Sequence, residues 1–312
     1  MISFAKKAIL YVWRLPRRML RKITTDPFRF PTIRMANRGL KFLASEPFKG
    51  LPFDQKKHDA IMSREPADTR YVIFFTPRSG SSRLTDLLTR TGRMGRPDEV
   101  FNPDFTSGIA TAYSARNMRE LVALILRGHT TGRVFGCEVT YVHLFFAFWS
   151  GRRFLKAIDP TSTAWLIRED IVAQAVSISR MIQTDVSHSV EGDGEDHRAT
   201  DDRFYYHPKQ IKSAIARIRW MESQTEKMIA RHRLQPLRLS YEQCVGMPEN
   251  DLVRKIADHV GVALPPSEVH GTHRRVSGNK SQDIAERFRQ EHPTLVTKLD
   301  KQRASMLAAL QK

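Results

Sequence analysis

Cysteine is nearly absent from the 312-residue chain, which contains only Cys137 and Cys244. A disulfide-built scaffold and a zinc site of four cysteines are therefore both excluded. Long hydrophobic runs are missing too. The longest apolar stretch, Val139 to Trp149, spans eleven positions and contains His143, whereas a membrane-spanning helix needs about 20 residues. We therefore expect no membrane-spanning helix, and the scarcity of cysteine favours a reducing, cytoplasmic compartment.

Acidic residues are also few: the chain has 33 Asp and Glu and 51 Lys and Arg, which gives a formal net charge of +18. Hydrophobic residues make up 41% of the chain, which is typical of a folded protein and excludes a wholly disordered one. A positive excess of this size predicts an anionic partner. Nucleic acid, a lipid surface and a phosphorylated small molecule all qualify, so the position of the charge has to decide among them.

The positive charge is concentrated at the amino terminus, where the first 45 residues carry eleven Lys and Arg and a single acid. Within residues 1–25 the basic and apolar side chains fall on opposite sides of a helical wheel, which predicts an amphipathic basic helix interrupted at Pro16. We interpret residues 1–65 as an appendage punctuated by prolines and residues 66–312 as the main domain. The helix docks on an anionic membrane surface, packs back onto that domain, or belongs to a transit-like segment.

Strand and helix patterns alternate from Arg70 onward. Tyr71 to Phe75 is a continuous β-branched and aromatic run, typical of a strand buried on both faces of a parallel sheet. Further strands are expected at Val134 to Tyr141, Thr163 to Ile167 and Leu237 to Tyr241. Helices are expected at 115–127, 170–185, 208–231 and 249–260. This alternation predicts an α/β fold in which helices flank a parallel sheet.

An anion-binding loop is predicted directly after the first strand, where the chain reads Thr76-Pro77-Arg78-Ser79-Gly80-Ser81-Ser82-Arg83. Backbone N–H groups at a helix amino terminus attract anions, Gly80 permits close approach, and Arg78 offers a fork of donors to phosphate oxygens. The lysine and first glycine of a nucleoside triphosphatase loop are missing, which disfavours a magnesium-dependent kinase. The alternative is an ordinary serine helix cap.

A second basic position follows the predicted strand Thr163 to Ile167. Arg168 stands where the chain leaves the sheet, and the helix after it carries polar side chains on one face: Gln174, Ser177 and Arg180. These residues suit a second phosphate. The alternative for Arg168 is an ion pair with Glu169 or Asp170.

The chain resembles the trehalose 2-sulfotransferase family of carbohydrate sulfotransferases, which use 3′-phosphoadenosine-5′-phosphosulfate as donor. Three segments carry the resemblance: the loop at 76–84, the segment Gly92 to Phe101, and the helix region Arg168 to Thr184. Weaker support comes from 237–242 and 275–281. The resemblance covers about residues 70 to 290 and implies the P-loop-like nucleotide-binding architecture of these enzymes, a carbohydrate acceptor, no metal, and a homodimer. The basic amino-terminal segment suggests that the acceptor is a glycolipid at a membrane surface.

The resemblance also assigns the donor site. The 5′-phosphosulfate would be held by Arg78, Ser79, Gly80, Ser81 and Ser82. The 3′-phosphate would be held by Arg168 and Ser177, and the nucleotide would be covered by Arg275 and Lys280. A solvated basic loop is the alternative for the last pair.

Chemistry at the acceptor needs a base, because a sugar hydroxyl is a poor nucleophile. Glu99 matches the proposed base of the family and follows the phosphate-binding helix, while Asp98 is the competing carboxylate. The alternative for Glu99 is a surface ion pair with Arg96. Arg78 is expected to stabilise the charge that develops on the leaving nucleotide.

Two departures from the family pattern lie toward the acceptor. The chain reads Gly136-Cys137-Glu138 where the family usually has a lysine after a glycine, and Ser187 replaces an aromatic residue. The acceptor therefore need not be trehalose. The acidic segment 191–203 is either a lid or a solvated loop, and it lacks the ligand spacing of a metal site.

These observations predict a metal-independent sulfotransferase that acts on a carbohydrate or glycolipid hydroxyl, in the cytoplasm or peripherally at the inner membrane surface. The competing hypothesis is a non-catalytic protein that uses an α/β scaffold to bind nucleic acid or a membrane surface. Over half of the net charge lies outside the domain that carries the motifs, so nucleic acid is the less favoured partner.

Overall fold

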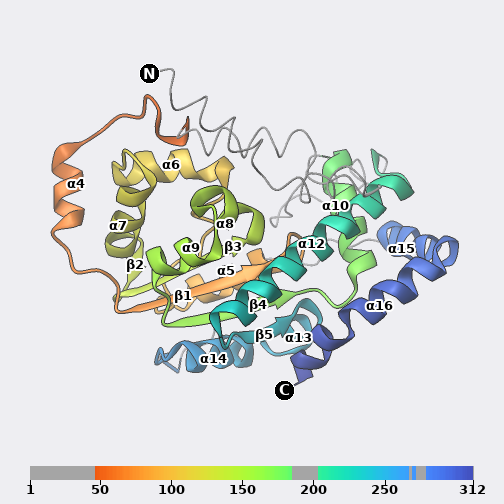
Figure 1. Ribbon diagram of the computed structural model, residues 1–312. Coiled ribbons are helices and arrows are strands. Elements are labelled where there is room, and N and C mark those ends of the chain that lie inside the picture. The colour runs from red at the N-terminus through yellow and green to blue at the C-terminus, as the bar shows by residue number, and fades with distance from the viewer. Residues whose placement is uncertain (1–45, 185–202, 267–268, 272–278, 312) are drawn as a thin grey trace.

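A computed structural model describes residues 46–184, 203–266, 269–271 and 279–311. Its sheet has five strands: β1 (Thr69–Phe75), β2 (Thr130–Thr131), β3 (Val134–Thr140), β4 (Ser162–Ile167) and β5 (Leu237–Ser240), in the spatial order β2-β3-β1-β4-β5 (Figure 1). Strands β3, β1, β4 and β5 run parallel, and β2 pairs antiparallel with the start of β3. Phe75 lies beside Thr140 and Leu166 in register, so the parallel strands end at a common edge.

Helices connect and cover these strands. They are α4 (Gln55–Met62), α5 (Ser81–Arg90), α6 (Pro103–Tyr113), α7 (Met118–Gly128), α8 (Tyr141–Phe148), α9 (Gly151–Ile158), α10 (Ile171–Thr184), α12 (Pro208–His232), α13 (Tyr241–Gly246), α14 (Glu249–Val260), α15 (Asn279–Glu291) and α16 (Pro293–Ala308). Short 3-10 turns occupy Glu46–Phe48 (η1) and Ala309–Gln311 (η2).

Both faces of the sheet are buried, as the continuous apolar run of β1 predicts. Val72 and Phe74 face a core that includes residues of α6, α7 and α9, whereas Ile73 and Phe75 face a second core with residues of α5 and α14. A third cluster joins α10, α12, α15 and α16, which Figure 1 shows as a group beyond one end of the sheet. This group is built around α10, so it sets the position of the second basic motif.

The α/β fold with a largely parallel, helix-flanked sheet is confirmed, and most expected elements lie within three residues of their predicted ends. The strand expected to reach Tyr141 stops at Thr140, because the Thr140 side chain accepts from the backbone N–H of His143 and caps α8. The helix expected from position 115 begins at Met118, where Asn117 caps it.

Several helices were not predicted, among them α6, α8 and α9. Most of the apolar stretch at 139–149 forms α8. This helix has few polar residues, so its sequence lacks the alternation of apolar and polar positions by which an amphipathic helix is predicted. Within the described part of the chain, no helix combines the length and apolar character that crossing a bilayer requires.

Residues 1–45 of the predicted appendage, including the basic helix at 1–25, lie outside the described residues. The described remainder packs on the domain: η1 contacts α6, α4 contacts α7, and Ile61 belongs to the first core. The boundary between 65 and 66 stays a prediction.

Candidate active site

The loop after β1 presents a helix amino terminus without a side-chain cap. Gly80, in the left-handed conformation with φ 83°, is the N-cap residue of α5, and no side chain caps the helix there. Ser79 is fully buried, and its hydroxyl has no hydrogen-bond partner among the described residues. An ordinary serine cap is therefore the wrong interpretation. The first-turn N–H groups and a buried hydroxyl suit an anion instead.

The loop is held close to the end of β5 by a glycine contact. A Cβ atom on Gly80 would lie only 2.6 Å from Cδ2 of Tyr241, so no larger residue fits without displacing the ring. The guanidinium carbon of Arg168 lies 4.5 Å from the centre of the same Tyr241 ring. A single aromatic ring therefore contacts both the loop and Arg168.

Helix α10 holds the loop from its other side. The amide of the buried Gln174 donates to Thr76 Oγ1 at 2.9 Å and to the carbonyl of Pro77 at 2.8 Å. Arg78 Nε donates to Ser177 Oγ at 2.9 Å. The polar face predicted for this helix thus faces the first loop, and Arg78 and Ser177 form one cluster.

Three arginines approach one another at this edge of the sheet: Arg78, Arg168 and Arg180. The pKa of the Arg78 guanidinium is lowered, first by its burial and then by the positive charges of Arg168 and Arg180. Arg180 is itself buried. Like charges brought together in a partly buried site favour the binding of an anion, which relieves their repulsion.

Arg168 does not form the ion pair that its sequence neighbours suggested. Its nearest carboxylate is Glu242, with Nε 3.8 Å from Oε1, and Nε has no hydrogen-bond partner among the described residues. Glu169 instead accepts from Ser240, and Asp170 pairs with Arg289. Arg168 therefore keeps donor capacity for a ligand.

A residue from the far end of the chain positions Arg168. Arg303 on α16 is buried and donates to the backbone carbonyls of Arg168 and Glu169, each at 2.5 Å. It also pairs with the fully buried Glu222 of α12 at 2.8 Å. Sequence reasoning missed Arg303 because no local pattern marks a contact across 135 positions.

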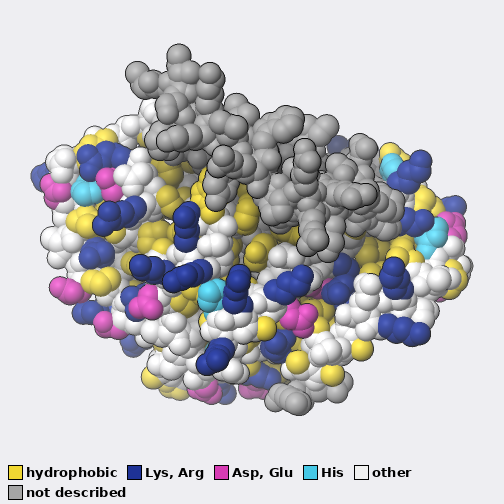
Figure 2. Space-filling model, viewed as in Figure 1, with side chains coloured by type: hydrophobic (Ala, Val, Ile, Leu, Met, Phe, Trp, Pro, Cys, Tyr) yellow, Lys and Arg dark blue, Asp and Glu magenta, His cyan; other side chains and the backbone are white. Residues whose placement is uncertain are grey.

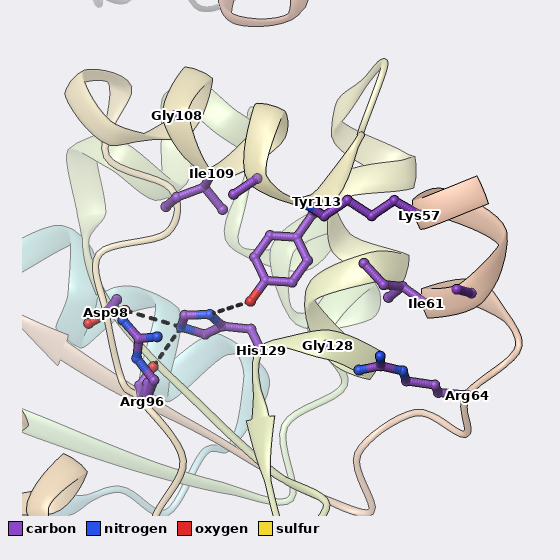
Figure 3. Close-up of a pocket in the computed structure, with 12 residues that line it drawn as sticks. Lys57, Ile61, Arg64, Arg96, Asp98, Gly108, Ile109, Tyr113, Gly128 and His129 are labelled. Atoms are coloured by element: carbon purple, nitrogen blue, oxygen red, sulfur yellow. Dashed lines mark hydrogen bonds and ion pairs between the residues drawn. The ribbon is translucent and has the colours of Figure 1, made fainter. Parts of the chain in front are cut away.

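The two candidate bases face different partners. Asp98 Oδ2 lies 3.5 Å from Arg96 and 3.2 Å from Nε2 of His129 (Figure 3). Glu99 Oε2 accepts from the Asn102 amide at 2.9 Å and lies 3.5 Å from Nδ1 of His143. Within the described residues, the surface pair with Arg96 thus belongs to Asp98 and not to Glu99.

Glu138 links the candidate base to the loop. It is buried on β3, its Oε2 has no hydrogen-bond partner in the described part of the chain, and its side chain forms a hydrogen bond with Ser81. Its backbone N–H donates to the carbonyl of Asp98 at 3.2 Å. Burial raises the pKa of Glu138 well above its usual value, the charges of Glu99 and Asp98 raise it further, and the Ser81 hydrogen bond opposes them. The neutral acid is therefore favoured between Glu99 and the start of α5.

The remaining predicted residues are more peripheral. Ser82 lies half-buried in the first turn of α5, and Lys280 lies in the first turn of α15, which packs against α10. Arg275, Ser187 and the acidic residues 191–202 lie outside the described residues. Among the residues whose placement is described, no cluster of three His, Cys, Asp or Glu side chains suits a metal ion.

In a comparison with known protein families, a model described as Stf0 sulphotransferase matches residues 147–291. Comparison with curated proteins gives no match. The matched stretch contains Arg168, Ser177 and Tyr241, whereas the loop at 76–83 and Glu99 precede it. The family resemblance inferred from the sequence is confirmed over this stretch.

Proposed function

Because residues 147–291 match the Stf0 sulphotransferase model, we propose that the chain transfers a sulfuryl group from 3′-phosphoadenosine-5′-phosphosulfate to a carbohydrate or glycolipid hydroxyl. The convergence of Arg78, Arg168 and Arg180 beside the uncapped start of α5 carries this proposal. A nucleotide that bears phosphate at both ends of its ribose would meet positive charge and backbone donors at each end.

The donor site is proposed from the same residues. Arg78, Ser79, Gly80, Ser81 and Ser82 hold the 5′-phosphosulfate in this proposal, with the unpartnered hydroxyl of Ser79 as support. Arg168 and Ser177 hold the 3′-phosphate, and Ser177 exchanges its bond with Arg78 for one to the ligand. Lys280 and Arg275 close over the nucleotide.

The proposed reaction balances without a metal or redox partner. The acceptor oxygen forms a bond to sulfur while the bond from sulfur to the bridging phosphate oxygen breaks, and adenosine 3′,5′-bisphosphate leaves. Glu99 takes the acceptor proton, supported by its partial exposure and by Asn102, which orients its carboxylate. Arg78 and the loop N–H groups stabilise the charge on the leaving nucleotide.

The arginine cluster predicts selective binding of a nucleotide with a 3′-phosphate. Arg168→Gln is expected to weaken binding of adenosine 3′,5′-bisphosphate about ten- to hundredfold, because it removes a charged hydrogen bond of roughly 1.5 to 3 kcal/mol. Binding of AMP should change little. Calorimetry at physiological salt measures both. Equal losses for both nucleotides, or wild-type protein that does not prefer the bisphosphate over AMP plus sulfate, would favour the polyanion-binding hypothesis.

The proton acceptor predicts a second result. Glu99→Gln is expected to lower turnover about 10²- to 10⁴-fold, since a general base contributes that much, while bisphosphate affinity stays within about twofold. Transfer of labelled sulfate from the donor into fractionated cell glycolipids and polysaccharides measures turnover. Asp98→Asn is the matched variant: full loss in Asp98→Asn with activity retained in Glu99→Gln would assign the base to Asp98.

We further propose that the protein acts in the cytoplasm at an anionic membrane surface, where residues 1–25 bring it to a glycolipid acceptor. The net positive charge of this segment supports the proposal. A homodimer remains part of the proposal through the family resemblance, and sedimentation equilibrium of the full chain tests it.

A further inference from the structure

A cavity of about 530 Å³ opens beside the segment that carries the two candidate bases. Helix α4, helix α6, the end of α7 and residues 96–98 line it (Figure 3). Its apolar lining comes from Ile61, Ile109 and several small residues. Neither the proposed donor site nor the family match, which begins at residue 147, accounts for it.

Positive charge dominates the rim of this cavity. Lys57, Arg64 and Arg96 line it, and Asp98 is the only acid in its lining. The structure records an ion pair between Arg96 and Asp98, whereas it records none for Lys57 or Arg64 with any described residue. The cavity therefore keeps a positive excess that an anionic ligand would complement.

One wall of the cavity is rigidly built. The buried His129 contacts the Tyr113 hydroxyl through Nδ1 at 2.9 Å and the carbonyl of Arg96 through Nε2 at 2.9 Å. Gly128 permits this packing, because a Cβ there would lie 2.8 Å from Cε1 of Tyr113 and 3.2 Å from Cγ2 of Ile61. The side chain of Tyr113 and the backbone of Arg96 are thus held by the two ring nitrogens of His129 (Figure 3).

The charges of Arg64 and Arg96 both influence the Tyr113 hydroxyl in the cavity wall. Burial raises the pKa of the Tyr113 hydroxyl, Asp98 adds to that rise, and the positive charges of Arg96 and Arg64 oppose it. Both arginines therefore act on the Tyr113 hydroxyl, although they come from opposite ends of the lining. A ligand oxygen near this hydroxyl would feel both positive charges.

The cavity also borders the proposed reaction centre. Asp98 lines it, and Glu99 is the next residue, so their Cα atoms are about 3.8 Å apart. Glu99 is not among the residues that line the cavity, so a ligand seated there reaches the proposed base only if it extends past Asp98. An acceptor that extends from the cavity past Asp98 would bring a hydroxyl toward Glu99.

We propose that this cavity binds a phosphate group carried by the sulfate acceptor, so that the acceptor is a phosphorylated carbohydrate or a phosphate-bearing glycolipid. The identification of the ligand as the sulfate acceptor rests on the proposed function. The binding of phosphate in the cavity stands on the geometry of the cavity alone, and it is tested separately.

Calorimetry on the full chain tests the proposal, with adenosine 3′,5′-bisphosphate present in excess to fill the donor site. The probes are glucose 6-phosphate, glucose, and dihexanoyl phosphatidic acid below its micelle concentration. We expect at least one phosphate probe to bind tenfold or more tightly than glucose. Whichever phosphate binds better identifies the source as soluble or lipid-borne.

Two sets of variants locate the binding. The double variant Lys57→Gln with Arg64→Gln is expected to lower the affinity for the phosphate probe at least tenfold. Both residues are exposed and have no recorded ion pair, so their replacement should not disturb the fold. A Cβ on Gly108 would meet nothing within 4 Å, so Gly108→Trp fills the cavity and abolishes binding, while Gly108→Ala retains it. The affinity for adenosine 3′,5′-bisphosphate should stay unchanged in all three variants.

The outcomes separate the two proposals. Phosphate probes that bind no better than glucose, or that bind equally to the double variant and the wild type, overturn the cavity proposal. If bisphosphate itself fails to bind, the proposed function fails, and the same titrations without it still decide the cavity.

Discussion

Glu138 belongs to the segment Gly136-Cys137-Glu138, in which the family resemblance leads us to expect a lysine. A lysine in this segment would add positive charge beside the loop, whereas Glu138 is a buried acid hydrogen-bonded to Ser81. A charged carboxylate there would oppose the proposed phosphosulfate and Glu99 together. Burial and the neighbouring carboxylates raise the pKa of Glu138, which favours its neutral form and reduces this repulsion.

The titration of Glu138 predicts how stability depends on pH. Its folded pKa is raised above the ordinary value of 4.5, so the folded state binds the proton more tightly than the unfolded state. The associated stability is fully present below pH 4.5 and is lost as pH rises toward the folded pKa. Glu138→Gln should therefore become progressively more stable relative to wild type above that pH, as urea unfolding would measure.

Glu120 provides the control of opposite sign. Its hydrogen bonds with Arg116 lower its pKa from 4.5, so its contribution is present above that pH and is lost as pH falls. Glu120→Gln should not alter the pH dependence between roughly pH 5 and 8. A stability difference between wild type and Glu138→Gln that stays constant across this range would contradict the assignment.

Helix α16 shows how one element can define a site that it does not line. Its Arg303 fixes the carbonyls at the end of β4, α10 follows directly, and α10 then holds the loop of α5 through Gln174. Arg219 pairs with the same Glu222 that Arg303 contacts. The proposed 3′-phosphate site therefore depends on packing between α12, α16 and the sheet.

Removing the contacts of Arg303 should lower the free energy of unfolding by a measurable amount. Arg303→Met is expected to destabilise the fold by about 3 kcal/mol, because it leaves buried Glu222 and two carbonyls with fewer donors, and to weaken bisphosphate binding as well. Arg287→Met is the matched control: its pair with Glu291 on α15 is exposed to solvent and should contribute little to stability. Urea unfolding compares them, and equal effects would refute the role of Arg303.

At the scale of the whole molecule, charge is distributed in two ways. Figure 2 shows Lys and Arg side chains along a band across one face of the described structure, interrupted by acidic and uncharged side chains. The sequence adds a separate basic segment at residues 1–25, outside the described residues. A mixed face of this kind suits steering of small anions more than tracking of a nucleic-acid backbone.

The basic segment predicts binding to anionic vesicles. Changing Lys6, Lys7, Arg14 and Arg17 to Gln in the full chain should lower co-sedimentation with phosphatidylserine vesicles at least tenfold, since each charge contributes about 1 kcal/mol near such a surface. The matched control changes four exposed basic residues of the domain: Arg254, Lys255, Lys298 and Lys301. Equal binding by both variants would show that general charge, and not this segment, attracts the membrane.

The sequence by itself determined the buried parallel strands, the loop and Arg168 at strand ends, and the family resemblance, because these features depend on local runs and short spacings. Only the tertiary structure decided that Arg78 contacts Ser177, that Asp98 and not Glu99 takes Arg96, and that Arg303 holds Arg168. Such contacts join residues that no local pattern relates. They arise when helices pack on the sheet, and packing is a property of the whole folded chain.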